Sequence, residues 1–324
     1  MTAPISIVVV PREQFSVTER ALETLYACTE GPFELVYVDG GSPPSTRDYL
    51  RAEAARRGFE LVRTERHLTP NEARNLGLAR ATGEHVVFVD NDLLVSPGWL
   101  EPLVACARET GAWIVGPLYL EGEPEDRVIH MAGGTCEFRG EAPHREFLTE
   151  HLLQHVTLDE LDAPLGRAPR DFVEFHCMLL TREALDRVAP FDERLMNTRE
   201  HIVACLDAAE AGGGVWLEPA STVCYKAPPP LAREDAPYFL LRWSETWTRV
   251  TLRRFIERYG LDPSYEDRAS IAAARRSVVF RPFTDRAGAL LGAPVGRLAH
   301  RVLSRVEQPV NRLWSRRRAA ARAA

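Results

Sequence analysis

The 324-residue chain lacks several features that define whole classes of protein. No apolar run approaches the roughly 18 residues that a membrane-spanning helix needs, which excludes such a helix from this sequence. The six cysteines are widely scattered without a Cys-x-x-Cys pair, so we expect buried free thiols instead of zinc ribbons or a disulfide framework.

Two nucleotide-binding loops are also missing. The first apolar segment is followed by Pro11-Arg12-Glu13-Gln14-Phe15, where a dinucleotide-binding Rossmann domain would carry G-x-G-x-x-G. A sugar-1-phosphate nucleotidyltransferase should likewise carry a glycine-rich phosphate loop at this position. Both classes of enzyme are therefore disfavoured.

The N-terminus has no basic start and too short an apolar run for a signal peptide, so we expect a cytoplasmic protein. Hydrophobic residues make up 45% of the chain and charged residues 27%, as in ordinary globular proteins. Residues 275–324 hold twelve arginines against Asp285 and Glu307, a surplus of ten positive charges. The net charge of −6 leaves −16 for residues 1–274, so body and tail differ electrostatically.

Strand-like and helical segments alternate regularly in the first 115 residues. This alternation predicts an α/β fold with a mostly parallel, Rossmann-like sheet flanked by helices. The strand-like runs begin near Ile5, Glu34, Glu60, His85 and Trp113, and the helical segments are Thr18–Cys28, Ser45–Arg57, Asn71–Thr82 and Gly98–Thr110.

The pattern becomes irregular from Leu118 to Arg170, and a long interruption of this kind is typical of a substrate-facing surface. We expect one polar helix inside it, over Glu146–Asp162. Beyond it, the sequence predicts a strand over Phe172–Leu180, a helix over Thr198–Ala211 and strands over Val215–Pro219 and Thr222–Tyr225. The run Pro228-Pro229-Pro230 predicts a boundary between a domain of residues 1–228 and a helical C-terminal extension of residues 229–324.

The segment Val86–Asp92 is an apolar strand that ends in Asp90-Asn91-Asp92. In open α/β sheets, ligands bind beyond the carboxyl ends of the strands, so the two carboxylates are placed to hold a metal. Their hard oxygens suit Mg²⁺ or Mn²⁺. The alternative is an acidic turn that caps a helix beginning near Pro97.

Several motifs stand at or near the ends of the expected strands: Ile5–Pro11, Val36–Ser42, Asn71–Gly77, Val89–Asp92, Pro190–Glu193 and Arg199–His201. Their order and spacing resemble those of the family 2 glycosyltransferases of GT-A fold, over roughly residues 4–226. The resemblance implies an enzyme that transfers a sugar from a nucleotide-sugar donor, with inversion and with Mn²⁺ or Mg²⁺ as cofactor. The acceptor would be a glycan, a lipid-linked molecule, a peptide or a small molecule.

The resemblance also implies roles for single residues. Asp92 would bind the metal, and Asp90 would contact the ribose or the metal shell. Asp39 would read the base, usually uracil, although Gly40 replaces the Asn that often follows it. The donor site would further include Pro11, Asn71, Arg74, Asn75, Asn91 and Lys226.

Three of these roles have plainer alternatives. Asp39 would serve equally to stabilise its own turn. Arg74 would lie on an exposed helical face, paired with Glu72 or Glu84. Lys226 is the only lysine of the chain and stands near the position where the family often has a metal-binding His. It would either neutralise the donor diphosphate or simply be exposed.

Inversion requires a base for the acceptor hydroxyl. The family pattern places this base in a Glu-Asp pair, whereas the present chain has Glu200-His201. We favour Glu200, with His201 as the alternative. His130 and His176 would line the acceptor side, or they would be hydrogen-bonded histidines of the core.

From Val295 onward, apolar residues recur at helical spacing among arginines. This pattern predicts a basic amphipathic helix, interrupted near Pro309 and followed by a disordered end from Arg316. Such a helix would contact an anionic membrane surface at the inner membrane face, or its apolar side would pack on the core. Nucleic-acid binding is not expected, because no recognition module accompanies the basic residues. The remaining alternative is a catalytically degenerate nucleotide-sugar-binding scaffold, recruited through this tail.

Overall fold

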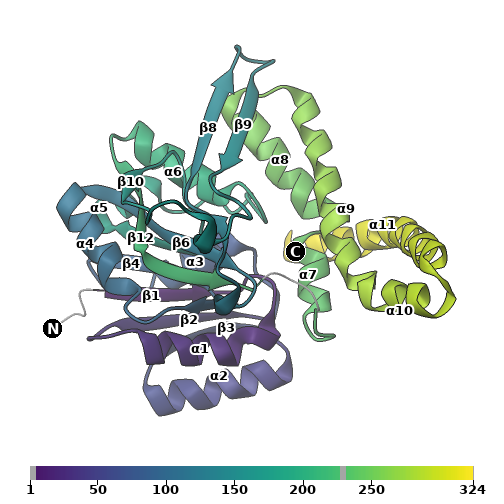
Figure 1. Cartoon of the computed structure of the whole chain (residues 1–324), viewed down its shortest axis with the longest axis horizontal. Helices are drawn as coiled ribbons and strands as arrows, with labels where there is room; N and C mark the ends of the chain where they lie inside the picture. The colour runs from purple at the N-terminus through teal and green to yellow at the C-terminus, as the bar shows by residue number, and fades with distance from the viewer. Residues whose placement is uncertain (1–4, 227–230, 324) are drawn as a thin grey trace. The chain divides into compact units, whose positions relative to one another are not determined.

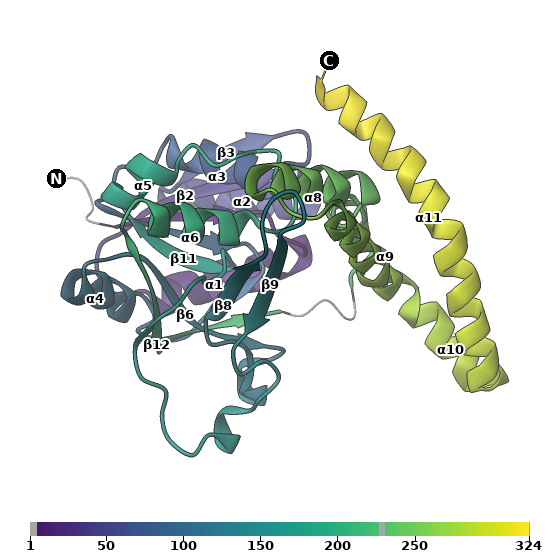
Figure 2. The same ribbon diagram turned by 90° about the horizontal axis from the view of Figure 1, so that it is seen from above.

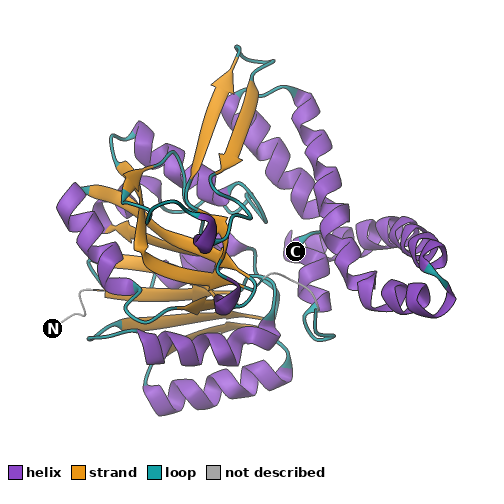
Figure 3. Ribbon diagram, in the orientation of Figure 1, coloured by secondary structure: helices purple, strands orange, loops and turns teal. Residues whose placement is uncertain are grey.

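The structure of the chain, a computed structural model, describes residues 5–226 and 231–323, with side chains as far as Arg318. Its centre is a mixed, curled sheet of ten strands flanked by helices (Figure 1). The strand order is β10-β12-β6-β11-β4-β1-β2-β3, with β5 beside β12 and β7 beside β6. A separate two-stranded sheet consists of β8 and β9 (Figure 3). The predicted α/β class is confirmed.

The strands have the following bounds: β1 Ile5–Val10, β2 Glu34–Gly40, β3 Glu60–Thr64, β4 His85–Asp90, β5 Leu93–Val95, β6 Ala112–Glu121, β7 Val128–Met131, β8 Gly134–Arg139, β9 Glu146–His151, β10 Ala168–Pro169, β11 Cys177–Thr181 and β12 Gly214–Tyr225. The α-helices are α1 Thr18–Cys28, α2 Pro44–Arg57, α3 Pro70–Leu78, α4 Leu100–Thr110, α5 Arg182–Val188, α6 Glu200–Glu210, α7 Ala236–Arg242, α8 Glu245–Tyr259, α9 Ser270–Arg276, α10 Arg281–Leu291 and α11 Ala293–Ala323. Short 3-10 helices are η1 Phe15–Val17, η2 Pro124–Asp126, η3 Leu158–Glu160, η4 Pro263–Ala269 and η5 Ser277–Phe280.

The parallel part of the sheet comes from the N-terminal half of the chain. There β1 pairs in parallel with β2 and β4, and β2 with β3. The strands β1, β2 and β4 are buried on both faces, which explains their nearly continuous apolar sequences. On the other side, β11 runs antiparallel between β4 and β6. The carboxyl ends of β1, β2 and β4 therefore meet at one edge of the sheet.

Local sequence places helix α3 against this edge. Thr69 and Glu72 form a capping box at its start, in which each side chain bonds to the other's backbone N–H. A Cβ atom at Gly77 would lie 2.3 Å from Cγ1 of Val8, so glycine allows the helix to approach β1 closely. This contact fixes the position of Arg74 and Asn71, which precede Gly77 on the same helix.

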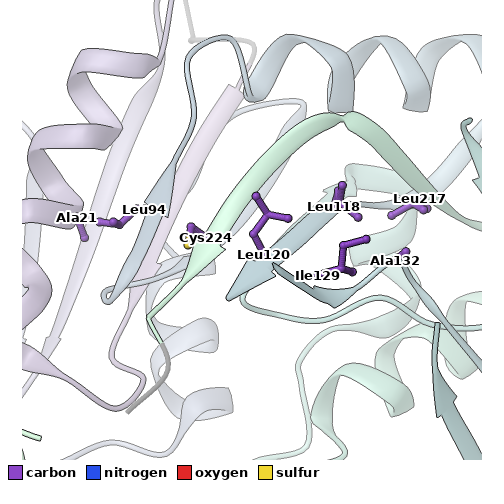
Figure 4. Packing of buried hydrophobic residues seen from close by; sticks show 8 residues of the cluster. All are labelled: Ala21, Leu94, Leu118, Leu120, Ile129, Ala132, Leu217 and Cys224. Atoms are coloured by element: carbon purple, nitrogen blue, oxygen red, sulfur yellow. The ribbon is translucent and has the colours of Figure 1, made fainter. Parts of the chain in front are cut away.

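A cluster of buried apolar residues packs against the irregular segment 118–170 (Figure 4). Its buried members are Ala21, Leu94, Leu118, Leu120, Ile129, Ala132, Leu217 and Cys224. Leu153, Leu158, Leu161 and Leu165 pack against it from the irregular segment. These leucines anchor the irregular segment to the core without an α-helix.

Several predicted boundaries were wrong. The polar segment 146–162 is not a helix: it contains β9, which pairs with β8, and the short η3. The strand predicted over 172–180 begins only at Cys177, and residues 172–176 form a loop. The two strands predicted after Gly214 are one continuous strand, β12, with an irregularity between Glu218 and Thr222.

The chain divides into two compact units. The first consists of Met1–Arg139, Phe147–Glu193 and Arg199–Ala227, and the second of Gly140–Glu146, Arg194–Thr198 and Pro228–Ala324. The boundary that we predicted at Pro228-Pro229-Pro230 lies outside the described residues. Within the second unit, the buried side chain of Asn197 donates to the carbonyl of Arg242 and to Oγ1 of Thr248, at 2.8 Å each.

The tail is one helix instead of two. α11 continues through Pro309 to Ala323 (Figure 2), so the predicted break near Pro309 and the disorder predicted from Arg316 were wrong. An internal proline removes a single backbone hydrogen bond, and the Arg, Glu, Gln and Leu residues around it favour the helical conformation. Within residues 5–226 and 231–323, no helix is long and apolar enough to cross a membrane.

Candidate functional site

The Asp90-Asn91-Asp92 segment lies at the carboxyl end of β4, next to the loop that follows β1. Side chains from the segment hold this loop through its backbone. Asn91 accepts from the N–H of Arg12 at 2.7 Å and donates to the carbonyl of Gln14 at 3.1 Å. Asn91 is therefore a structural clamp for the loop.

Asp92 has one oxygen engaged and one available. Its Oδ2 accepts from the backbone N–H groups of Glu13 and Gln14, at 3.0 and 2.9 Å. Its Oδ1 is buried and has no hydrogen-bond partner among the residues that the structure describes. A buried carboxylate oxygen without a partner is costly unless a ligand or a cation completes it.

Two arginines connect Asp90 with Glu200. Arg12 places Nε 3.5 Å from Oδ2 of Asp90 and Nη1 3.8 Å from Oε1 of Glu200. Arg74 places Nη2 4.0 Å from Oδ1 of Asp90 and Nη1 3.9 Å from the same oxygen of Glu200. Arg74 is fully buried, with its guanidinium 3.8 Å from the centre of the Phe175 ring. The alternative of an exposed Arg74 paired with Glu72 or Glu84 is thereby excluded.

The site carries more negative than positive charge. Glu13, Asp90, Asp92 and Glu200 are all buried, and two guanidinium groups lie among them. Burial would raise the pKa of Asp90, but the hydrogen bond from His176 and the charges of Arg12, His176 and Arg74 hold that pKa below its ordinary value. Burial and the charges of Asp90 and Glu13 raise the pKa of Asp92 to about 7. A bound cation would relieve this excess of negative charge.

Asp39, at the end of β2, is buried and already has protein partners. Its carboxylate accepts from the N–H and hydroxyl of Ser42, at 3.0 and 2.9 Å, and forms an ion pair with Arg63. This is the turn-stabilising arrangement considered above. Pro11 lies close by, since a Cβ atom on Gly40 would lie 3.0 Å from its Cγ.

Asn71 and Asn75 fasten α3 to the segment that precedes α6. Asn71 donates to the carbonyl of Asp192 at 2.9 Å. Asn75 donates to the carbonyl of Phe191 at 3.0 Å and accepts from its N–H at 2.9 Å. Both amides are therefore positioning groups for the neighbourhood of Glu200.

Glu200 and His201 begin α6, and their environments differ. Glu200 is buried and near both arginines, whereas the ring of His201 lies 5.7 Å from that of Phe172. Burial lowers the pKa of His201 to about 4, despite the nearby charges of Glu174 and Glu200. His201 is therefore neutral at pH 7 and a weak base.

This lowered pKa predicts how the stability of the chain depends on pH. The unfolded chain binds more protons at His201 between pH 6.5 and 4, so the stabilisation is complete above pH 6.5 and is lost as the pH falls toward 4. The charged groups that act on the ring are Glu174, Glu200, His151 and Arg199. We expect acidification from pH 7 to pH 4.5 to cost native protein about 2 kcal/mol more than His201→Gln, measured by urea unfolding at each pH. Equal losses in the two proteins would show that His201 does not titrate in this range.

Lys226 does not extend freely from the end of β12. Its ammonium group forms an ion pair with Glu123, and its carbonyl accepts from Nε2 of Gln14 at 2.9 Å. The preceding Tyr225 places its hydroxyl 3.1 Å from Oε2 of Glu13. Both residues therefore border the loop after β1.

His130 and His176 are buried and joined through Glu174. The Nε2 atom of each ring lies 3.1 Å from Oε2 of Glu174. Nδ1 of His176 lies 2.8 Å from Oδ2 of Asp90, so His176 connects this cluster to the Asp-x-Asp segment. Burial would lower the pKa of His130, but Glu174 and Glu121 raise it to about 9. Both histidines are thus hydrogen-bonded within the core, and their place on the acceptor side stays a prediction.

Several site residues were missed by sequence reasoning: Arg12, Glu13, Arg63 and Glu174. Arg12 and Glu13 directly follow Pro11, so their place at the end of a strand was a usable signal. Arg63 stands one residue before the end of β3, beside Asp39 in the register of the sheet. Glu174 lies in a loop whose sequence resembles that of a strand, so the sequence pattern did not mark Glu174 as a site residue.

The chain matches the model of the glycosyl transferase family 2 over residues 6–188. Among curated relatives, a pre-mycofactocin glycosyltransferase of Mycobacterium tuberculosis is 27% identical over 194 residues, which cover 59% of this chain and 37% of that protein. The human polypeptide N-acetylgalactosaminyltransferase 15 is 27% identical over 224 residues, covering 66% and 34%. The chain thus spans little more than a third of the length of these relatives.

Solved structures show the same fold at low identity. GalNAc-T7 with UDP, GalNAc and Mn²⁺ aligns at a TM-score of 0.54 and 17% identity, covering 85% of this chain and 54% of that one. The mannosyltransferase PcManGT of Pyrobaculum calidifontis, in complex with GDP-Man and Mn²⁺, aligns at 0.52 and 17%, covering 98% and 85%. These are GT-A glycosyltransferases, and the family model covers more than half of the chain. The chain therefore belongs to glycosyl transferase family 2.

Proposed function

We propose that the chain transfers a sugar from a nucleoside-diphosphate donor to an acceptor hydroxyl, with inversion, at the edge where β1, β2 and β4 end. The observation that carries this proposal is the bridging of Asp90 and Glu200 by Arg12 and Arg74. The same two guanidinium groups thus contact Asp90, on the donor side, and Glu200, the candidate base. The nucleotide-bound states of the two GT-A structures support a donor of this class.

The carboxylates of Asp90 and Asp92 fit a divalent cation, Mn²⁺ or Mg²⁺. Support comes from the buried, unpartnered Oδ1 of Asp92 and from the excess negative charge among the described residues around it. When bound, the cation would neutralise the donor diphosphate as charge develops there. Lys226 would contribute to the same neutralisation only after it leaves Glu123.

Glu200 is the proposed base. Its carboxylate accepts the proton of the acceptor hydroxyl while that oxygen bonds to the anomeric carbon. The bond from the anomeric carbon to the diphosphate oxygen breaks at the same time, and its electron pair leaves with the nucleoside diphosphate. Arg12 and Arg74 orient Glu200 and add positive charge near the departing group. Glu200 is favoured over His201 because Arg12 and Arg74 hold its carboxylate, whereas the ring of His201 lies 5.7 Å from that of Phe172.

We infer that Asp39 orders the base-binding turn through Ser42 and Arg63. Asp39→Asn should weaken nucleoside-diphosphate binding about tenfold, because the amide cannot form the ion pair that holds the turn. Titration calorimetry with UDP and GDP would measure this loss, with Asp126→Asn as a control in η2. Unchanged affinity for both nucleotides would separate Asp39 from the donor site.

We further propose that α11 lies on an anionic membrane, at the inner membrane face. Its apolar side chains remain exposed: Leu298, Val302, Val306, Val310 and Leu313 are each at least 50% accessible. Arginines at positions 297, 301 and 305 follow the same helix and would meet lipid phosphates.

Vesicles that contain phosphatidylglycerol test this proposal. Leu298→Glu with Val302→Glu should weaken co-flotation more than tenfold, since two apolar contacts worth about 1.5 kcal/mol each are lost. Ile271→Glu, at another exposed apolar position of the same unit, is the matched control. Equal flotation of all three proteins, or none by the native chain, would refute membrane contact.

A degenerate scaffold that binds nucleotide sugars without turnover is the second candidate. It is favoured by Tyr225-Lys226 near the position where the family often carries a metal-binding His, and by the engagement of both residues with carboxylates. Donor binding without any release of nucleoside diphosphate would distinguish it from the enzyme.

A further inference from the structure

We propose that His130, Glu174 and His176 bind a transition-metal ion of the zinc class, at a site that adjoins the Asp-x-Asp segment through the contact of His176 with Asp90. One ligand atom from each of the three residues lies within 4.8 Å of the others. Two imidazoles and one carboxylate are the protein ligands of many sites for zinc and related ions. This proposal stands independently of the glycosyltransferase reaction.

The spacing of the ligand atoms already fits a small cation. Oε2 of Glu174 lies 3.1 Å from Nε2 of His130 and 3.1 Å from Nε2 of His176. In a tetrahedral site with bonds of about 2.0 to 2.1 Å, adjacent ligand atoms are about 3.3 Å apart. For these two pairs of ligand atoms, the observed spacing differs from the tetrahedral one by a few tenths of an ångström.

The outer nitrogens of both rings face further carboxylates. Nδ1 of His176 lies 2.8 Å from Oδ2 of Asp90, and Nδ1 of His130 lies 3.3 Å from Oε2 of Glu121. Histidine ligands usually donate their second N–H to a carboxylate, which fixes the tautomer and leaves Nε2 as the electron-pair donor. Both rings have this arrangement.

The site is preorganised by the surrounding core. The Tyr119 hydroxyl accepts from the N–H of Glu174 at 3.0 Å and lies 2.8 Å from the carbonyls of Glu174 and Cys177. It thus fixes the loop that carries two of the three ligands. The ring of Tyr225 lies 4.2 Å from that of His176, centre to centre. His130 is held on β7 by pairing with β6.

His151 is a candidate fourth ligand, and Glu121 and His155 connect the site toward solvent. Nε2 of His151 lies 3.9 Å from Oε1 of Glu174, and its side chain is 27% exposed. Burial lowers the pKa of His151, which keeps its nitrogen available to a metal. Glu121 and the exposed His155 continue the chain of contacts toward solvent, with 2.7 Å between them.

Zn²⁺ alone is the probe. The full chain, stripped with EDTA and dialysed, is titrated with ZnSO₄ against a chromogenic chelator, without nucleotide. We expect one tight equivalent in native protein and in Asp92→Asn. Glu174→Gln and His130→Gln should bind at least about a hundredfold more weakly, and Glu121→Gln should lose 10- to 100-fold through its outer contact. His144→Gln, an exposed histidine of the second unit, should match native protein.

Co²⁺ gives a second measurement that needs no variant to fold. Histidine and carboxylate ligands of low coordination number should give intense visible absorption, whereas an octahedral oxygen site gives weak bands. The proposal would be overturned if native protein leaves all Zn²⁺ with the chelator, or if the Co²⁺ spectrum is that of an octahedral site. It would equally be overturned if Asp92→Asn abolishes binding while His130→Gln does not.

Discussion

Asp92→Asn should reduce donor turnover about a thousandfold, the equivalent of about 4 kcal/mol of transition-state stabilisation. The variant removes the negative charge at the buried Oδ1 while the amide oxygen can still accept from the N–H groups of Glu13 and Gln14. The loss should therefore appear in turnover and not in folding. Release of nucleoside diphosphate from the donor, with water as acceptor, measures it without knowledge of the natural acceptor.

The matched control is Asp48→Asn, on the exposed side of α2, where the aspartate forms a surface ion pair with Arg47. Its turnover should equal that of the native chain. Native-like turnover in Asp92→Asn, with Mn²⁺ present, would remove Asp92 from the donor site and leave it as a clamp for the loop after β1.

Glu200→Gln should lower turnover 10²- to 10⁴-fold while donor affinity changes little. The amide keeps the shape of the side chain but cannot accept a proton from the acceptor. Arg12 and Arg74 still have Asp90 as a partner in this variant, so the donor side should remain in place. Donor affinity by calorimetry and turnover by nucleoside-diphosphate release separate these two effects.

Glu210→Gln is the control, because Glu210 ends the same helix and is exposed. It should behave as native protein does. If Glu200→Gln retains full turnover and His201→Gln loses it, the base is His201 despite its lowered pKa. If both variants retain turnover, neither residue is the base.

The parallel sheet could be predicted from the sequence, although not the order of its strands, because β1, β2 and β4 are largely apolar and separated by helices. A regular alternation of strand-like and helical segments over many residues identifies the elements even where a short segment alone is ambiguous. The loop 172–176 was harder to predict from the sequence. Phe172, Val173 and Phe175 are buried in the core, and burial alone does not distinguish a strand from an ordered loop.

The sequence predicted the position of the candidate site but not the contacts among its side chains. Strand-end placement located Asp90 and Asp92, and resemblance located Arg74 and Glu200. Their connections depend on long-range geometry that no local pattern encodes, such as the contact of Arg12 with Glu200, 188 positions later in the chain. For the same reason the sequence did not show that Asn71 and Asn75, expected at the donor, hold the backbone before α6.

The most direct test of the account is donor binding by the native chain. Its thermal unfolding would be followed with a panel of UDP- and GDP-sugars, in Mn²⁺ and in EDTA, beside Asp92→Asn. We predict that one nucleotide class raises Tm by several degrees in Mn²⁺, and that EDTA or Asp92→Asn removes this shift. If no nucleotide sugar raises Tm under any of these conditions, the donor site proposed at the ends of β1, β2 and β4 is wrong.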